Sequence, residues 1–188
     1  MKHIATVALM LNFGVASIYA QQKPVTMTFS GTSGPSAINL QQPNTITGED
    51  NFAGNGALGP FTFRNISAEG TIPQQSSTCS GPTKLYFVRV DGAGVFRFQD
   101  GSLLKVLLTQ GADCIDLAAQ QAHCTVTFKI TGGTGRFSNA SGILTLTETV
   151  VPVLADHSNN PVFTASTGAF TGTVSGVAAQ EERQDEWR

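Results

Sequence analysis

The sequence predicts an all-β protein, an eight-stranded antiparallel β-barrel, with a β-sandwich as the alternative. Three observations predict it. Most segments after residue 20 alternate apolar and polar residues with the period of a strand. Short turn signals such as Asp91-Gly92 and Asp100-Gly101 separate them. No stretch carries sustained helical periodicity. Pairing of the first strand with the last would distinguish a barrel from a sandwich.

The first half of the chain contains two clean alternations, at 25–30 and 60–64. The Gly-, Ser-, Pro- and Asn-rich region 31–60 between them is expected to be a long connection, with one short strand near Phe52. Residues 70–83 form a second expected loop. Residues 85–90 are apolar on both parities, which suits a strand covered on both faces. Asp91-Gly92 then predicts a hairpin into 94–98.

The second half continues with strands at 102–109, 124–130 and 143–151. Residues 113–123 are expected to hold a connection with a helical turn. Residues 163–177, rich in Thr, Ser and Gly, are expected to form a closing strand or strand pair. Together these segments form one predicted domain, 21–178, followed by a charged tail, 179–188, that we expect to be mobile.

Residues 1–20 are typical of a signal peptide. Lys2 and His3 precede an apolar run that is too short to span a bilayer. Cleavage after Ala20 is expected, with a rival site after Ala16, and an uncleaved anchor helix is the alternative. We therefore expect an exported protein, periplasmic or extracellular, with no membrane span in the mature chain.

Charge excludes one class of partner. The formal net charge is −2, and no basic block precedes the tail. Nucleic-acid binding depends on a basic surface, so no nucleic acid is expected as a partner.

Three cysteines, at 79, 114 and 124, are expected to oxidise after export. Cys114 and Cys124 are close in sequence, so we expect them to pair, contributing about 2.5–3 kcal/mol in the chain-entropy description. Cys79 is then free or pairs with another chain. Asp113, Asp116 and His123 beside the two cysteines suggest zinc, but their spacing fits no common structural zinc pattern. No metal is expected.

The glycine cluster at 132–135 is expected to be a structural turn. A phosphate-binding loop needs a following helix and usually a lysine, and here Arg136-Phe137 and a Thr-rich strand follow instead. The turn residues are Gly132, Gly133, Thr134, Gly135, Phe137 and Gly142.

The full spacing, Gly-Gly-Thr-Gly-x-Phe-x-x-Ala-x-Gly at 132–142, resembles the glycine corner of plant dirigent proteins. A related corner occurs in allene oxide cyclases, and exported bacterial proteins without assigned activity carry the same corner. The resemblance implies an eight-stranded antiparallel barrel with a central cavity, often assembled as a homotrimer. It carries over no catalytic residue, because no short motif here matches the catalytic positions of either family.

Glu148 is the candidate catalytic residue. It shares parity with Leu144, Leu146 and Val150, so its carboxylate would point into an apolar barrel, where desolvation raises the pKa of a carboxyl group. The alternative is that the strand bends or ends there and Glu148 reaches solvent.

Four further residues are candidates to line a ligand cavity: Tyr86, Arg89, Arg97 and Phe128. Either arginine would bind an anionic group or pair with Glu148 if it faced inward. The alternative places the arginines outside and Phe96 and Phe98 inside. For Tyr86 the alternative is a half-buried packing role.

Two functions are considered, and the first is preferred over an enzyme because no catalytic set can be recognised in the sequence. The first is a binding or structural module whose Phe-rich barrel holds a small apolar ligand or supports self-association. The second is a cyclase or isomerase that uses Glu148 as its acid or base. Neither function requires a cofactor.

Overall fold

The computed structural model describes residues 22–158 and 160–178. The predicted signal peptide, 1–20, and the predicted mobile tail, 179–188, lie outside the described residues. Within the described residues, no helix combines the length and the apolar character that crossing a membrane would need.

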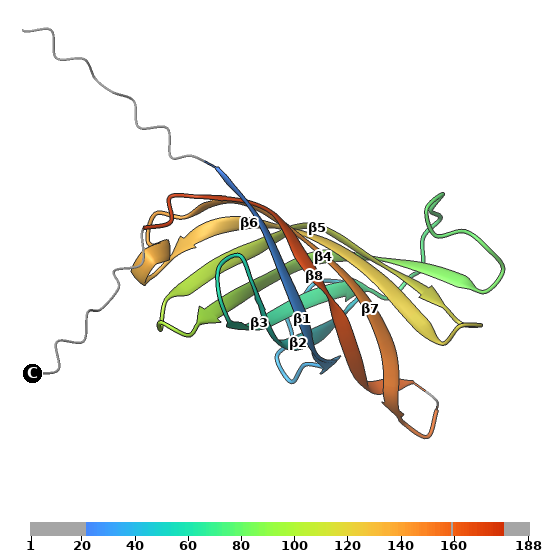
Figure 1. Ribbon diagram of the computed structural model, residues 1–188. Helices are drawn as coiled ribbons and strands as arrows, with labels where there is room; N and C mark the ends of the chain where they lie inside the picture. Colours follow the sequence, from blue (N-terminus) through green and yellow to red (C-terminus); the bar gives the residue numbers. More distant parts are fainter. Residues whose placement is uncertain (1–21, 159, 179–188) are drawn as a thin grey trace, which may run out of the picture.

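Eight antiparallel strands close into one barrel (Figure 1). Each strand pairs with its neighbours in sequence, and β1 pairs with β8 from Lys23↔Val174 to Ser33↔Thr164. This pairing confirms the barrel and excludes the sandwich. The strands are β1 (Lys23–Pro35), β2 (Thr45–Gly56), β3 (Phe61–Gly70), β4 (Lys84–Phe98), β5 (Leu103–Asp116), β6 (Gln121–Gly133), β7 (Ser141–Ala155) and β8 (Pro161–Ser175), with one short 3₁₀ helix, η1 (Gly135–Phe137).

The expected hairpin at Asp91-Gly92 is wrong, because β4 runs straight through it. Asp91 and Gly92 pair with Ala68 and Ser67 of β3. A side chain at position 92 would meet the backbone of Ile66 and Ser67, so this glycine permits close strand contact instead of a turn. Strand β4 instead carries a β-bulge, because Asp91 pairs with Ala68 and Arg89 with Glu69.

Two expected connections are also shorter than predicted. The region 31–60 contributes the end of β1 and all of β2, so most of it is strand. Residues 113–123 form the β5–β6 hairpin, with Asp116 paired to Gln121 and a turn at 117–120. In both regions, polar residues and glycines obscure the alternation of apolar and polar residues, but they do not prevent strand pairing.

One half of the barrel interior is an aromatic core. Phe63 is fully buried, and its ring centroid lies 4.4 Å from that of Phe96 and 4.9 Å from that of Phe170. Small barrels have interiors that side chains can fill. The buried phenylalanines are Phe29, Phe52, Phe61, Phe63, Phe96, Phe98, Phe128, Phe137 and Phe170.

The glycine corner joins β6 to β7 and closes this aromatic end. Gly132 and Gly135 have φ of 102° and 58°, values that glycine adopts without steric cost. The Thr134 amide donates to the Leu103 carbonyl at 2.9 Å. The Arg136 guanidinium lies over the Phe98 and Phe137 rings, 5.0 and 4.6 Å from their centroids, and pairs with Asp100 at 2.9 Å.

The predicted Cys114–Cys124 disulfide is wrong, because Cys114 pairs with Cys79 and Cys124 is buried and unpaired. In the β5–β6 register Cys114 lies opposite His123, and Cys124 lies opposite Asp113. Positions 114 and 124 therefore face opposite sides of the sheet. The loop 71–83 brings Cys79 back to the outer face of β4 and β5, where Gln74 bridges to Tyr86.

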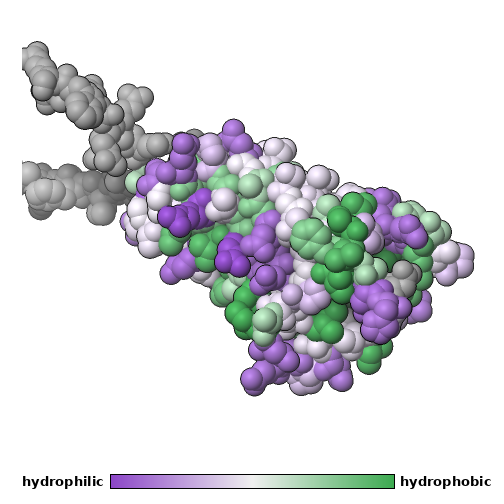
Figure 2. Space-filling view, turned by 90° about the horizontal axis from the view of Figure 1, so that it is seen from below, coloured by the Kyte–Doolittle hydropathy of each residue, from purple (hydrophilic) through white to green (hydrophobic). Residues whose placement is uncertain are grey.

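At the opposite end of the barrel the strands extend as separate arms. Pairing of β7 with β6 ends at Val150, but the β7–β8 hairpin continues to Ala155 and Pro161. Its exposed apolar side chains are Val151, Val153, Leu154 and Phe163. Figure 2 shows bands of apolar surface between polar ones on the face seen from below.

Candidate functional site

The second half of the barrel interior is polar and is centred on Arg89. The β-bulge at Val90 turns Arg89 inward, whereas Arg97, eight positions later, is exposed while Phe96 and Phe98 fill the core. The two arginines have the same sequence parity but face opposite sides of the sheet. Arg97 is therefore not a cavity residue. For this arginine the alternative is correct, in which it faces outward while Phe96 and Phe98 face inward.

Asp113 is the closest partner of Arg89. The Arg89 Nε donates to Asp113 Oδ2 at 2.8 Å and to Oδ1 at 3.1 Å. A register irregularity in β5 between Leu108 and Gln110 reverses the inward phase of that strand, so that Asp113 follows Leu104 and Val106 onto the inner face. Charge-assisted contacts of this length are strong, so Asp113 fixes the position of the guanidinium.

The Nη1 atom of Arg89 faces β2 and β3. It lies 3.6 Å from Asp50 Oδ2 and 3.4 Å from the Ser67 hydroxyl. Asn65 donates its Nδ2 to the same Asp50 oxygen at 2.8 Å. Asp50, Asn65 and Ser67 are all buried, so three adjacent inward positions on two strands carry polar groups.

Glu148 closes the cluster from β7. Its side chain is 0% exposed, and it lies on the inner face with Leu144 and Leu146, as its parity predicts. Its Oε1 lies 3.7 Å from Arg89 Nη2, and neither carboxyl oxygen has a hydrogen-bond partner of good geometry, although the Ser166 hydroxyl lies near enough to act against the rise in pKa. Burial, together with the charge of Asp50, raises the pKa of Glu148 to about 8, against the opposing effect of Arg89.

Glu69 is the half-buried member of the cluster. It lies near the end of β3, opposite Arg89 in the β3–β4 strand register. Burial and the charge of Asp113 raise the pKa of Glu69 to about 8. Cys124 of β6 faces the same interior, and burial raises the pKa of its thiol well above the usual range. Both glutamates therefore hold protons at neutral pH and can exchange them near it.

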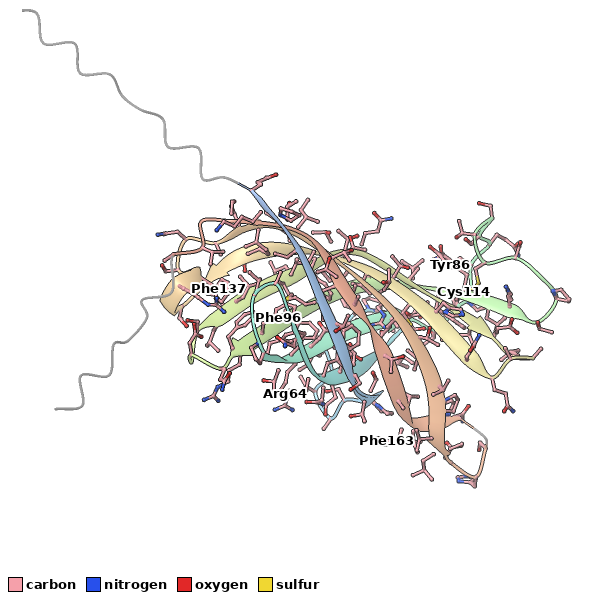
Figure 3. The ribbon with its side chains drawn as sticks, in the orientation of Figure 1. Arg64, Tyr86, Phe96, Cys114, Phe137 and Phe163 are labelled. Atoms are coloured by element: carbon pink, nitrogen blue, oxygen red, sulfur yellow. A yellow bond between two sulfur atoms is a disulfide. The ribbon has the colours of Figure 1, made fainter. Side chains whose placement is uncertain are left out.

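Two of the predicted cavity residues lie elsewhere. Tyr86 is in register with Cys114, on the outer face beside the disulfide (Figure 3). Phe128 is fully buried in the aromatic half, with its ring 5.9 Å from that of Phe63. Of the predicted candidates, the structure brings together only Arg89 and Glu148.

Sequence reasoning missed three carboxyl groups of the cluster, Asp50, Glu69 and Asp113. Asp50 shares parity with the buried Phe52, and Glu69 shares parity with Phe61 and Phe63, so alternation would have indicated both. For Asp113 the sequence indicates only the zinc alternative, because it stands beside Cys114. Within 22–158 and 160–178, no three His, Cys, Asp or Glu side chains converge as they would around a metal ion.

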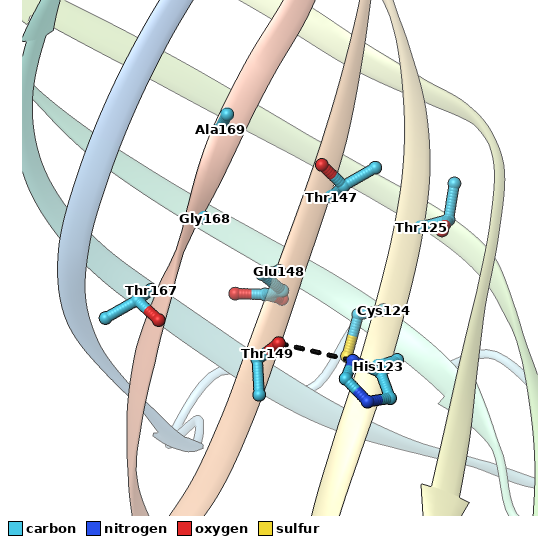
Figure 4. A pocket seen from close by; sticks show the side chains of 9 residues that line it. All are labelled: His123, Cys124, Thr125, Thr147, Glu148, Thr149, Thr167, Gly168 and Ala169. Carbon is cyan, nitrogen blue, oxygen red and sulfur yellow. Dashed lines mark hydrogen bonds between the residues drawn. The ribbon is translucent and has the colours of Figure 1, made fainter.

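A shallow depression of about 340 Å³ lies over β6, β7 and β8, lined by His123, Cys124, Thr125, Thr147, Glu148, Thr149, Thr167, Gly168 and Ala169 (Figure 4). His123, Thr125, Thr147 and Thr167 are exposed and lie on the outer face. The Glu148 side chain is fully buried and lies on the inner side of the sheet. The exposed residues that line the depression therefore lie on the other side of the sheet from that carboxyl group.

A smaller depression of about 180 Å³ lies at the other end of the molecule, beside Asp100 and Arg136. Its remaining lining comes from residues 57–60, in the β2–β3 turn, and from Gln99. Arg136 is held there by Asp100 and by the Leu58 carbonyl, which accepts from Nη2 at 2.6 Å. These contacts hold the end of the aromatic core closed.

A scan against family models and a search of curated proteins both find no match. Among solved structures, the pterocarpan synthase dirigent protein GePTS1 is similar with a TM-score of 0.37 and 11% identity, over 89% of this chain and 99% of that one. The chain is also similar to a nonspecific heme-binding cyclase that catalyses a [4+2] cycloaddition during neoabyssomicin biosynthesis. The TM-score is 0.35 and the identity 11%, over 86% of this chain and 69% of the cyclase. Similarities of this size assign neither a family nor an activity.

Proposed function

We propose that this chain is an exported barrel whose polar half is an acid–base site for a small molecule, of the cofactor-free cyclase or isomerase class. The observation that carries the proposal is Glu148. Its carboxyl group is fully buried inside the barrel, lies 3.7 Å from a guanidinium nitrogen, and has no hydrogen bond of good geometry on either oxygen. Perturbed carboxyl groups in such settings are typical of acid–base sites.

In the proposed role, Glu148 gives or takes a proton and Arg89 stabilises negative charge. A general acid or base works best when its pKa lies near the working pH, and the pKa of Glu148 is about 8. The Arg89 guanidinium is held by Asp113 at 2.8 Å, so it need not reorganise when charge develops beside Nη1 or Nη2. Both groups belong to this chain, so the proton transfer requires no cofactor.

An apolar ligand inside the barrel, the other function expected from the sequence, has less support. The aromatic half is occupied by phenylalanine rings that contact one another at centroid distances of 4.3 to 6.3 Å. A ligand there would have to displace packed side chains, which costs stability. The polar half offers charged groups, and these would penalise an apolar occupant.

Export is supported by the Cys79–Cys114 disulfide, because such bonds persist in oxidising compartments. The predicted homo-oligomer, a trimer by resemblance, stays a prediction. The exposed apolar side chains of the β7–β8 hairpin are the surface it would be expected to bury.

Native mass spectrometry of the exported, oxidised chain tests the site. We expect a bound molecule of small mass in the wild type and in Arg97→Gln, the exposed control, and its loss in Glu148→Gln. Incubating the recovered molecule with protein in D₂O then tests acid–base chemistry. Deuterium uptake or product formation that requires Glu148 supports the proposal. Equal turnover by Glu148→Gln, or an empty barrel in every variant, would overturn it.

A further inference from the structure

The acidic cluster has more hydrogen-bond acceptors than donors. Three buried side-chain oxygens have no hydrogen-bond partner of good geometry in the described residues: both carboxyl oxygens of Glu148, near which the Ser166 hydroxyl lies, and the Oδ1 atom of Asn65. The Arg89 Nε hydrogen is directed to Asp113, and the Asn65 amide to Asp50. When Glu148 is ionised, its unpaired buried acceptors are costly, so the ionised cluster favours a ligand that donates hydrogen bonds.

The same cluster has more negative than positive groups. Six strands contribute titratable or charged side chains: Asp50 from β2, Glu69 from β3, Arg89 from β4, Asp113 from β5, Cys124 from β6 and Glu148 from β7. Strands β1 and β8 add the Ser33 and Ser166 hydroxyls, 3.2 Å apart, and the Ser166 hydroxyl also lies near Glu148. Four carboxyl groups thus surround one guanidinium.

We infer that this cluster binds a small organic cation with N–H donors, a primary ammonium or guanidinium group, beside Glu148 and Asn65. The inference rests on the proposed function, because it names the substrate class of the same site. An anionic group is disfavoured, since the single guanidinium is already bound to Asp113 and flanked by Asp50 and Glu148. A metal ion is disfavoured because Arg89 lies between those carboxylates.

Protons supply the missing positive charge when no cation is bound. At neutral pH, Glu69 and Glu148 are largely protonated because burial raises the pKa of each to about 8. A bound ammonium group would favour the carboxylate form, so binding releases a proton from Glu148 to solvent. Apparent affinity should therefore rise with pH, by at most roughly tenfold per pH unit for each proton released, and level off above the pKa.

Access is expected from the end where the strands separate. Barrel pairing ends at Glu69↔Arg89 between β3 and β4, and at Ala122↔Val150 between β6 and β7. Beyond these points the β4–β6 strands and the β7–β8 hairpin extend in different directions (Figure 1). Glu69, half-buried at this end, is the first carboxyl group that an approaching cation would meet.

Isothermal titration of the exported, oxidised chain with n-propylammonium chloride tests the inference, with 1-propanol and sodium propionate as size-matched neutral and anionic probes. We expect binding of propylammonium only, with proton release detected by repeating the titration in buffers of different ionisation enthalpy. Glu148→Gln should weaken binding about tenfold or more at pH 8, since hydrogen bonds to charged groups contribute at this level. Arg97→Gln should bind as the wild type does.

The results separate the inference from the proposed function. Propylammonium that fails to bind, or binds Glu148→Gln equally well, overturns the inference. So does tighter binding of propanol or propionate, or competition by calcium chloride that shows a metal site. If a neutral molecule nevertheless undergoes Glu148-dependent turnover, the acid–base function stands and only the ligand class is wrong. If neither binding nor turnover depends on Glu148, both are wrong.

Discussion

Arg89 and Asp113 form a buried ion pair with 2.8 Å between Nε and Oδ2, although both have odd numbers on strands whose apolar inward residues, such as Phe96 and Leu104, have even numbers. Each strand has one irregularity, in β4 at Val90 and in β5 between Leu108 and Gln110. Beyond it, the odd-numbered side chains face the barrel interior in place of the even-numbered ones. The bulges therefore convert two outward positions into the centre of the polar half. This is a local device that redirects side chains without interrupting the strands.

Arg89→Met should destabilise the fold strongly at neutral pH. The change leaves Asp50 and Asp113 buried without their cation, and breaking one partner of a buried pair costs about 3–5 kcal/mol. Urea denaturation at pH 7 measures the loss. Arg97→Met, on the exposed face of the same strand, is the control and should stay within about 0.5 kcal/mol. Equal effects of the two variants would contradict the buried assignment.

Cys79→Ser should lower stability far more than Cys124→Ala. The Cys79–Cys114 bond spans 35 residues, for which the chain-entropy description gives about 4 kcal/mol. Removing the buried Cys124 thiol should cost about 1 kcal/mol. Denaturant curves measure both. Alkylation of the unfolded, unreduced chain should label Cys124 alone, so a label on Cys79 would show that the pairing is wrong.

The sequence was sufficient to predict the barrel and the inward orientation of Glu148, because the strands concerned are regular. Leu144, Leu146 and Glu148 lie on an uninterrupted stretch of β7, so parity alone assigns their face. Parity fails for Arg89 because the bulge at Val90, which the sequence does not signal, reverses the inward phase of β4. The predicted Cys114–Cys124 disulfide rested on nearness in sequence, which says nothing of the hairpin register that places the two cysteines on opposite faces. Asp91-Gly92 has the composition of a turn, but its glycine lies within β4 and allows close contact with β3.

Gly142→Ala should be among the costly glycine substitutions. Its φ is 141°, and a Cβ there would collide with the Thr173 carbonyl of β8. Strain and overpacking together should cost about 2–4 kcal/mol. Gly101 also has a positive φ, 81°, but a Cβ there meets nothing within 4 Å. Gly101→Ala should therefore cost only about 1–2 kcal/mol from backbone strain. Thermal and urea unfolding compare the two, and similar losses would contradict a close β7–β8 contact at Gly142.

Stability should fall as pH rises from about 5 to about 8, and Glu148→Gln should remove part of that slope. The folded pKa of Glu148 is raised to about 8, above its ordinary value of 4.5, so the folded chain retains a proton that the unfolded chain loses. This proton contributes fully to the free energy of unfolding at pH values below the pKa of Glu148 in the unfolded chain. The contribution is lost as pH rises through the pKa of Glu148 in the folded chain. Glutamine keeps the neutral form at every pH, and its amide group finds carboxylate acceptors nearby.

The two proteins should therefore be similar near pH 4, and the variant should gain relative to the wild type by up to about 1.4 kcal/mol per pH unit above pH 5. The gain should level off above pH 8. Urea denaturation at pH 4, 6, 8 and 9 measures the difference. Glu49→Gln, on the outward phase of β2, is the matched control and should show no such divergence. A Glu148→Gln variant that loses stability relative to the wild type as pH rises would mean that the carboxylate form is the one that the barrel stabilises.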